Sequence, residues 1–119
     1  SAVLLNRNAA VPWFILVPQT QMHDVLDLPD DQREAILAEC AAVSRFIKQQ
    51  LGFDKVNFAG LGNVVSVMHL HIIGRHSKDP CWPQPVWGNL PLGEPYAPEQ
   101  LREWQLNLVK TVGLTAATR

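Results

Sequence analysis

Two stretches of the chain carry hydrophobic residues at helical spacing. In the first, apolar residues recur every three or four positions while charged residues fall mostly elsewhere; the recurring residues are Ile36, Cys40, Val43, Ile47 and Leu51. This pattern predicts an amphipathic helix of about five to six turns. We expect it to begin in the acidic, proline-containing segment Asp27–Asp31 and to end with Gly52 as its C-terminal cap. A second helix is predicted from Pro98, with Leu101, Trp104, Leu108 and Val112 on its apolar side.

Runs of β-branched and aromatic residues predict strands between these helices. The runs are residues 3–5, residues 13–17 between Pro12 and Pro18, residues 56–59, and a long one at residues 64–73. The last two flank the glycine turn Gly60–Asn63, which predicts a hairpin. Residues 74–98 are rich in proline and should form an irregular loop tied to the body of the protein. The predicted fold class is α+β, an antiparallel sheet with one long helix and a C-terminal helix.

Length and charge narrow the classes of function. With 119 residues and 47% hydrophobic content, the chain predicts a single domain covering residues 1–119. The net charge is -1, and the acidic and basic residues are scattered along the chain without forming a basic stripe, so we expect no nucleic-acid partner. The apolar stretch Val11–Val17 is too short to span a membrane, and no signal peptide is expected. The first residues already read as a strand, which suggests that this N-terminal strand is truncated.

Cysteine usage bears on the compartment. Cys40 and Cys81 are the only two cysteines, and neither belongs to a CxxC pair. Two cysteines cannot form a disulfide scaffold, so a reducing cytoplasm is the expected location.

The strand around residue 70 carries the most informative chemistry. Because side chains alternate along a strand, Val67, His69, His71 and Ile73 should share one face, and Ser66, Met68, Leu70 and Ile72 the other, which is apolar enough to be core. The two histidines should therefore lie side by side, roughly 6–7 Å apart along the strand, on the face away from the core.

Paired imidazoles suit chemistry at a phosphate. A neutral imidazole can attack phosphorus, and a neighbouring one can donate a hydrogen bond to a phosphate oxygen. Two alternatives remain at this point. The pair could be fortuitous, or it could be half of a zinc site completed by His76 or Asp79. We rank metal binding below phosphate chemistry because nothing in the sequence fixes a third ligand.

The glycine turn before the histidines adds to the phosphate interpretation. Gly60 and Gly62 allow close approach of a ligand to backbone N–H groups. Asn57 precedes the turn and Asn63 closes it, and both offer neutral hydrogen-bonding side chains beside the histidines. Each of these residues is also an ordinary turn former.

These features together resemble the histidine triad (HIT) family. Its motif has three histidines at alternating positions, and here Val67 stands at the first while His69 and His71 match the second and third. The segments Pro12–Pro18, Lys55–Asn57, Gly60–Val65 and Asp79–Gly88 follow the same order as in a bacterial, diadenosine-polyphosphate-hydrolase-like branch. The likeness runs from about Leu4 to Tyr96.

The resemblance implies an α+β fold, usually as a homodimer, that binds a nucleoside phosphate and cleaves at its α-phosphorus. It implies that His69 is the nucleophile, through a nucleotidyl-histidine intermediate, and that His71 contacts the α-phosphate. It also implies further phosphate contacts from Asn57, Asn63 and the Gly62 backbone. Asn6 loosely matches a ribose-contacting position. The motif includes no carboxylate cluster for magnesium, so no metal or other cofactor is expected.

Departures from the motif define an alternative. Val67 cannot hydrogen-bond through its side chain, so His69 must be oriented by a backbone carbonyl or by Asn57. Trp13 stands where some relatives have another histidine. A nucleotide-binding module without turnover is therefore an alternative to the hydrolase.

Several other residues have weaker interpretations. Trp82 is a candidate pocket contact, although Trp82 and Trp87 are more readily explained as anchors of the proline-rich loop. Arg75 is expected to be an exposed strand-end charge. His76 is expected to be an ordinary loop residue and His23 a surface residue. A Cys81 nucleophile is disfavoured because nothing in the sequence lowers its pKa.

Overall fold

The computed structural model describes residues 1–112 and 115–118, with side chains described through residue 110. Its sheet has the strand order β3-β4-β2-β1-β5. The strands are β1 (Ala2–Leu5), β2 (Trp13–Val17), β3 (Lys55–Gly60), β4 (Leu70–Arg75) and β5 (Thr115–Thr118). The first four pair antiparallel, and β5 adds to β1 in parallel. The predicted α+β class is confirmed, although no strand was predicted at residues 115–118.

The long predicted helix is confirmed. A short 3-10 helix η1 (Val25–Asp27) precedes α1 (Asp30–Arg45), which continues into the π-helical turn η2 (Phe46–Gln50). The chain leaves the helix at Gly52, whose φ of 79° is the left-handed conformation that favours glycine. The second helix, α2 (Pro98–Val112), begins where predicted. No helix of the described residues is long and apolar enough to cross a bilayer.

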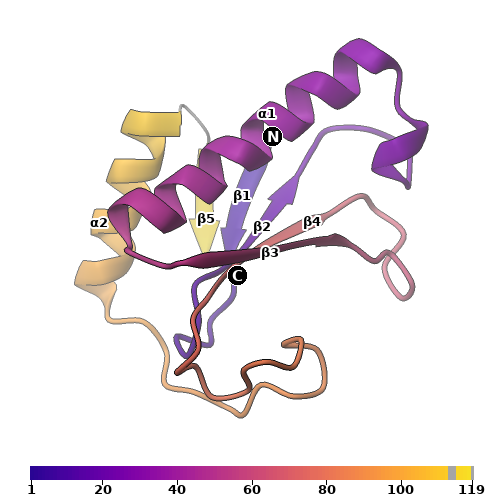
Figure 1. Cartoon of the computed structure of the whole chain (residues 1–119). Helices are drawn as coiled ribbons and strands as arrows, with labels where there is room; N and C mark the ends of the chain where they lie inside the picture. Colours follow the sequence, from indigo (N-terminus) through magenta and orange to yellow (C-terminus); the bar gives the residue numbers. More distant parts are fainter. Residues whose placement is uncertain (113–114, 119) are drawn as a thin grey trace.

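The main core lies between the helices and one face of the sheet (Figure 1). Alternate residues of each strand face it, including Val3 and Leu5 of β1 and Phe14 and Leu16 of β2. The buried residues of the predicted helix pack against them; they are Ile36, Cys40, Val43 and Ile47. Burial, together with the nearby Glu39 carboxylate, raises the pKa of the Cys40 thiol to about 12, so the thiol stays protonated at neutral pH.

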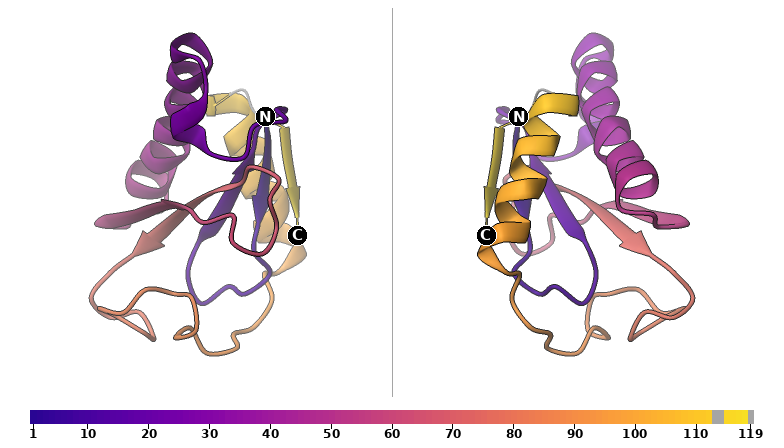
Figure 2. Two further views of the ribbon diagram at one scale, coloured as in Figure 1. Left: turned by 90° about the vertical axis from the view of Figure 1, so that its right-hand side faces the viewer. Right: turned by 90° about the vertical axis from the view of Figure 1, so that its left-hand side faces the viewer.

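The opposite face of the sheet is covered by irregular chain. Residues 76–97, here called the 76–97 loop, gather below the sheet on the side away from α1 (Figures 1 and 2). Cys81 and Val86 of this loop form a second cluster with Val11 and with Ile73 of β4. The predicted irregular but anchored loop is therefore present, and it encloses the sheet face that carries the histidines.

One strand prediction is wrong. Residues 61–69 form a loop, and β4 begins only at Leu70 instead of Val64. Leu70 is the first residue with paired neighbours on both sides, Gly60 of β3 and Leu16 of β2. The β-branched residues before it have no strand to pair with, and Val64 and Val67 are exposed. The hairpin is thus joined by a nine-residue loop, here called the 61–69 loop, and not by a tight glycine turn.

Candidate active site

His69 and His71 lie side by side. His71 belongs to β4 and is 6% exposed, whereas His69 ends the 61–69 loop and is partly exposed. Their ring centroids are 5.1 Å apart and the rings meet edge to face at 76°. Met68, Leu70 and Ile72 point into the main core, as strand alternation predicted. The two imidazoles therefore share the sheet face away from the helices.

A backbone carbonyl orients His69. Its Nδ1 lies 2.7 Å from the carbonyl oxygen of Val67. A carbonyl can only accept a hydrogen bond, so Nδ1 carries a proton, and in the neutral tautomer with this proton Nε2 keeps its lone pair. The sequence left two possible orienting groups, a carbonyl or Asn57, and the structure shows the carbonyl. Val67 thus supplies through its main chain what its side chain cannot.

His71 is oriented in the opposite sense. The indole N–H of Trp13 donates to His71 Nδ1 at 3.0 Å. Because an indole nitrogen can only donate, Nδ1 is the acceptor, and the proton of the neutral ring lies on Nε2. The two histidines therefore hold complementary tautomers. His69 presents a bare nitrogen suited to nucleophilic attack, and His71 presents an N–H suited to an oxyanion.

Aromatic rings surround His71. The ring of Trp87 packs edge to face against His71, with the ring centroids 5.0 Å apart. The ring centroids of Trp13 and Trp87 are 5.5 Å apart. Sequence reasoning did not identify Trp13 or Trp87 as contacts of the histidine pair. Strand alternation could have indicated the Trp13 contact, because Phe14 and Leu16 face the main core and Trp13 therefore faces the same side of the sheet as the histidines. Trp82, the predicted pocket contact, lies against the guanidinium of Arg75, whose Cζ is 5.6 Å from the centroid of the indole ring.

Arg75 is buried, which corrects the expectation of an exposed strand-end charge. It is 1% exposed and forms a two-pronged ion pair with Asp79, Nε to Oδ2 at 2.6 Å and Nη2 to Oδ1 at 3.1 Å. Burial acts to raise the pKa of the Asp79 carboxyl, but hydrogen bonds from Arg75 and from the Cys81 N–H outweigh it, so the pKa lies below its ordinary value. The pair is ionised at neutral pH.

Asn57 joins this buried pair to the histidine face. Its Oδ1 accepts a hydrogen bond from Arg75 Nη1 at 2.9 Å. In the ladder between β3 and β4, Asn57 lies opposite Ile73, and Ala59 lies opposite His71. Asn57 therefore occupies the same face as the histidines, between the levels of His71 and Arg75.

The remaining predicted residues are less closely gathered. Asn63 and Gly62 lie exposed in the 61–69 loop, and Gly62 has a φ of 67°. Asn6 uses its Oδ1 to accept from the Asn8 backbone N–H within its own turn. The turn residues therefore lie in the chain just before His69, while Asn6 serves local turn structure.

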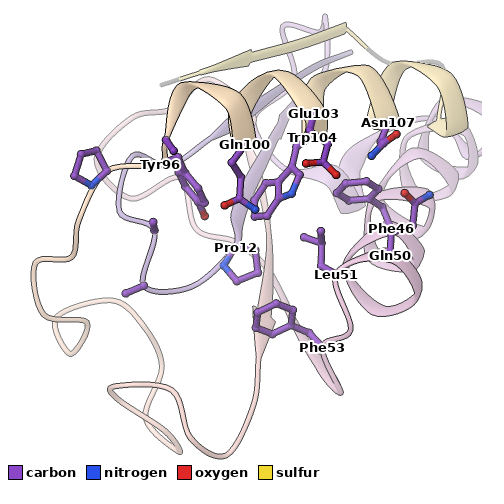
Figure 3. Close-up of a pocket in the computed structure, with 14 residues that line it drawn as sticks. Pro12, Phe46, Gln50, Leu51, Phe53, Tyr96, Gln100, Glu103, Trp104 and Asn107 are labelled. Carbon is purple, nitrogen blue, oxygen red and sulfur yellow. The ribbon is translucent and has the colours of Figure 1, made fainter.

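A cavity of about 560 Å³ lies elsewhere, between α2 and the end of η2 (Figure 3). Aromatic side chains, including Phe46, Phe53 and Trp104, line it together with polar Gln50 and Gln100. None of its lining residues belongs to the predicted site. The alternative of a metal centre has no third ligand here, since no group of three His, Cys, Asp or Glu residues within the described chain could hold an ion.

Comparison with known proteins shows the family. The HIT domain model matches residues 1–78, about two thirds of the chain, so this protein belongs to the HIT domain family. HIT domain proteins are generally nucleotide hydrolases or transferases, and this membership points to the same broad class of activity. A search of curated proteins gave no match.

Solved structures of histidine triad proteins from bacteria are similar to this chain over most of its length. One from Marinobacter aquaeolei VT8 is 38% identical, with a TM-score of 0.79, and the match covers 90% of this chain and 78% of the other. One from Bradyrhizobium japonicum is 33% identical, with a TM-score of 0.83, covering 92% and 82%. One from Sinorhizobium meliloti 1021 is 33% identical, with a TM-score of 0.79, covering 88% and 78%.

Proposed function

We propose that this chain is a nucleotidyl hydrolase or transferase that cleaves nucleoside phosphates at the α-phosphorus through His69. The observation that carries the proposal is the pair of hydrogen bonds at the two Nδ1 atoms, from which complementary tautomers follow. The Val67 carbonyl accepts from His69 Nδ1, which keeps a proton on that atom. The Trp13 indole donates to His71 Nδ1, which leaves the proton of His71 on Nε2. One ring is thereby prepared to attack phosphorus and the other to stabilise the charge on its oxygens.

The proposed reaction has two displacements. His69 Nε2 forms a bond to the α-phosphorus while the bond from phosphorus to the leaving group breaks; the leaving group departs with that electron pair and takes a proton from water. Positive charge develops on the His69 ring and strengthens its hydrogen bond to the Val67 carbonyl. Water then attacks the same phosphorus, releases His69 Nε2, and yields a nucleoside monophosphate and a proton.

Arg75 would not bind the phosphate directly, because its charge is already paired with Asp79. We propose His71 Nε2–H, the Asn57 amide, the Asn63 side chain and backbone N–H groups of the 61–69 loop, including that of Gly62, as the contacts. No step needs a metal ion or another cofactor. Asn6 and Trp82 remain weaker proposals for ribose or pocket contacts, because the structure gives each a local partner.

The substrate class follows the family branch. The segment Asp79–Gly88 resembles the diadenosine-polyphosphate-hydrolase-like branch, so we propose dinucleoside polyphosphates or nucleoside phosphoramidates as substrates. We propose that the protein acts as one domain in the cytoplasm, where its two free cysteines would remain reduced, without a nucleic-acid or membrane partner.

The test of the nucleophile is hydrolysis of adenosine 5′-phosphoramidate and of a diadenosine polyphosphate. His69→Ala should lower kcat by about 10⁴-fold or more, because no other group replaces the attacking nitrogen. His23→Ala is the matched control, since His23 is an exposed histidine far from motif residues in sequence. Equal turnover by wild type and His69→Ala would refute the assignment.

A second candidate function is nucleotide binding without turnover. It is favoured by one observation, that the first motif position is the exposed Val67 in place of a histidine. Mass spectrometry of the intact protein, kept at neutral pH after mixing with substrate, separates the two. An added nucleotidyl mass on wild type supports catalysis, whereas saturable nucleotide binding without adduct or product supports a binding module.

We also propose that the protein is a homodimer paired through β3. This strand lies at one end of the sheet order, and its Phe58 is 48% exposed beside a groove lined by Leu37 and Ala41 of α1. A second copy would cover both the strand edge and this apolar groove. Light scattering should give twice the mass of one chain, and Phe58→Glu should give one chain mass; a monomeric wild type would contradict the proposal.

A further inference from the structure

Arg75 is bonded on every side while almost wholly buried. Two of its nitrogens hold Asp79, and Nη2 also donates to the carbonyl oxygen of Gln84 at 2.8 Å. Its guanidinium lies under the ring of Trp82. These contacts all belong to the 76–97 loop. One nitrogen, Nη1, has a different target and donates to Asn57 Oδ1 on the neighbouring strand β3.

A buried ion pair contributes little net stability, because desolvation offsets most of its Coulomb attraction. An apolar pair could close the loop onto the sheet at similar stability. An apolar replacement could not provide the hydrogen bonds to Gln84 and Asn57, and of these only the bond to Asn57 reaches a strand of the sheet. The position of the charge is therefore better explained by what it does to Asn57 than by stability alone.

The bond to Arg75 fixes which way the Asn57 amide faces. A guanidinium has only donors, so the amide must turn its oxygen toward Arg75. The amide nitrogen then lies on the other side of Cγ. Asn57 lies between the levels of Arg75 and His71 on one face of the sheet, so an amide whose oxygen is held at Arg75 can present Nδ2 to the His71 side.

We propose that Arg75, held by Asp79, is a positioning residue that keeps the Asn57 amide nitrogen aimed at the phosphate-binding side of the histidine pair. The inference rests on the proposed function and deepens it by assigning a source for the orientation of Asn57. Without Arg75 the amide could rotate and present its oxygen, which would repel a phosphate oxygen. Lysine cannot replace arginine here, because one ammonium cannot reach Asp79 in two places and Asn57 in a third.

The test is a double-mutant cycle on adenosine 5′-phosphoramidate hydrolysis with Arg75→Lys, Asn57→Ala and the double variant. Each single variant should lower kcat by about 10- to 100-fold. The double variant should be no slower than Asn57→Ala, because Arg75 acts through Asn57. Losses that multiply in the double variant would overturn the proposal. Arg33→Lys is the matched control, since Arg33 also binds an aspartate and a backbone carbonyl, Asp30 and Leu28, but at the surface.

A second variant covers the case in which Arg75→Lys does not fold. Asn57→Asp keeps an oxygen for Arg75 Nη1 and removes the amide nitrogen. It should keep the wild-type melting temperature within a few degrees and still lose about 10- to 100-fold in kcat. Full activity of Asn57→Asp would show that Asn57 only satisfies Arg75, and would overturn the proposal.

A binding readout separates this proposal from the proposed function. If wild type hydrolyses none of the nucleotide probes, the proposed function fails, and the positioning claim is judged by NMR of the Asn57 side-chain amide with adenosine 5′-monophosphate. The claim predicts that these resonances shift on nucleotide addition in wild type and Arg33→Lys but not in Arg75→Lys. Equal shifts in Arg75→Lys, or none in wild type, would contradict it.

Discussion

The two faces of the sheet bury different kinds of residue. On the face that packs against α1 and α2, the buried cluster consists of hydrophobic side chains, among them Leu16, Leu70 and Ile72. The face under the 76–97 loop buries His71, Arg75 and Asp79 within or beside a much smaller apolar cluster. Buried polar groups are tolerated only with partners, and each of these three has specific ones. The helix face therefore holds the fold, while the loop face holds a set of oriented hydrogen-bonding groups.

The largest expected effect on stability comes from breaking the ion pair between Arg75 and Asp79 on the loop face. Asp79→Asn should lower the free energy of unfolding by about 3–5 kcal/mol at pH 7, because it leaves Arg75 buried and uncompensated. The folded-state pKa of Asp79 is lowered, so its contribution is present above its ordinary pKa of about 4 and is lost as pH falls below it. Urea unfolding at pH 7 and pH 3 should show the gap between wild type and variant narrowing in acid. A gap of equal size at both pH values would contradict this account.

A cavity on the helix face should affect stability but not the site. Leu16→Ala should lower the free energy of unfolding by about 3 kcal/mol, because Leu16 is fully buried against the helices. Its kcat/KM at a temperature where it stays folded should match wild type within about twofold. A selective loss of activity in the folded variant would show that the two faces are coupled more strongly than proposed.

On the same strand, Trp13→Phe should have the reverse profile. It removes the N–H that orients His71 and keeps an aromatic ring against Trp87. We expect about a tenfold loss in kcat/KM, the size seen when a partner that orients a functional histidine is removed. The change in melting temperature should be small. Unchanged kinetics with a large loss of stability would mean that Trp13 is only a packing residue.

The smallest effect is expected at the surface pair on α1. Arg33→Ala removes the ion pair between Arg33 and Asp30, which is exposed. It should change the free energy of unfolding by less than about 1 kcal/mol, because water competes for both charges. Denaturant unfolding of this variant beside Asp79→Asn measures how much burial changes the value of an Arg–Asp pair.

The sequence predicted those parts of the structure that come from a regular spacing of residues along the chain. The apolar period of Ile36, Cys40 and Val43 predicted the long helix. The alternating spacing also predicted that the rings of His69 and His71 lie side by side, although only His71 belongs to β4. The strand prediction itself failed at residues 64–69, because β-branched residues such as Val64 and Val65 favour a strand only where a partner strand is available, and none is.

The contacts that orient the site depend on tertiary structure. Trp13 and His71 are 58 positions apart, and their hydrogen bond exists only because β2 pairs with β4. Arg75 is read from sequence as a strand-end charge because charged residues are mostly exposed. Its burial follows from the turn after β4, which returns Asp79 to the guanidinium. The sequence alone therefore shows neither the strand pairing that brings Trp13 to His71 nor the burial of Arg75.

The central claim is that His69 and His71 hold opposite tautomers, fixed by the hydrogen bonds of their Nδ1 atoms. Long-range ¹H–¹⁵N NMR of the imidazole rings at pH 7.5 measures this directly, without a substrate. We expect a protonated Nδ1 and an unprotonated Nε2 on His69, and an unprotonated Nδ1, which accepts from Trp13, and a protonated Nε2 on His71. The same tautomer on both rings, or a proton on both nitrogens of His71, would contradict it.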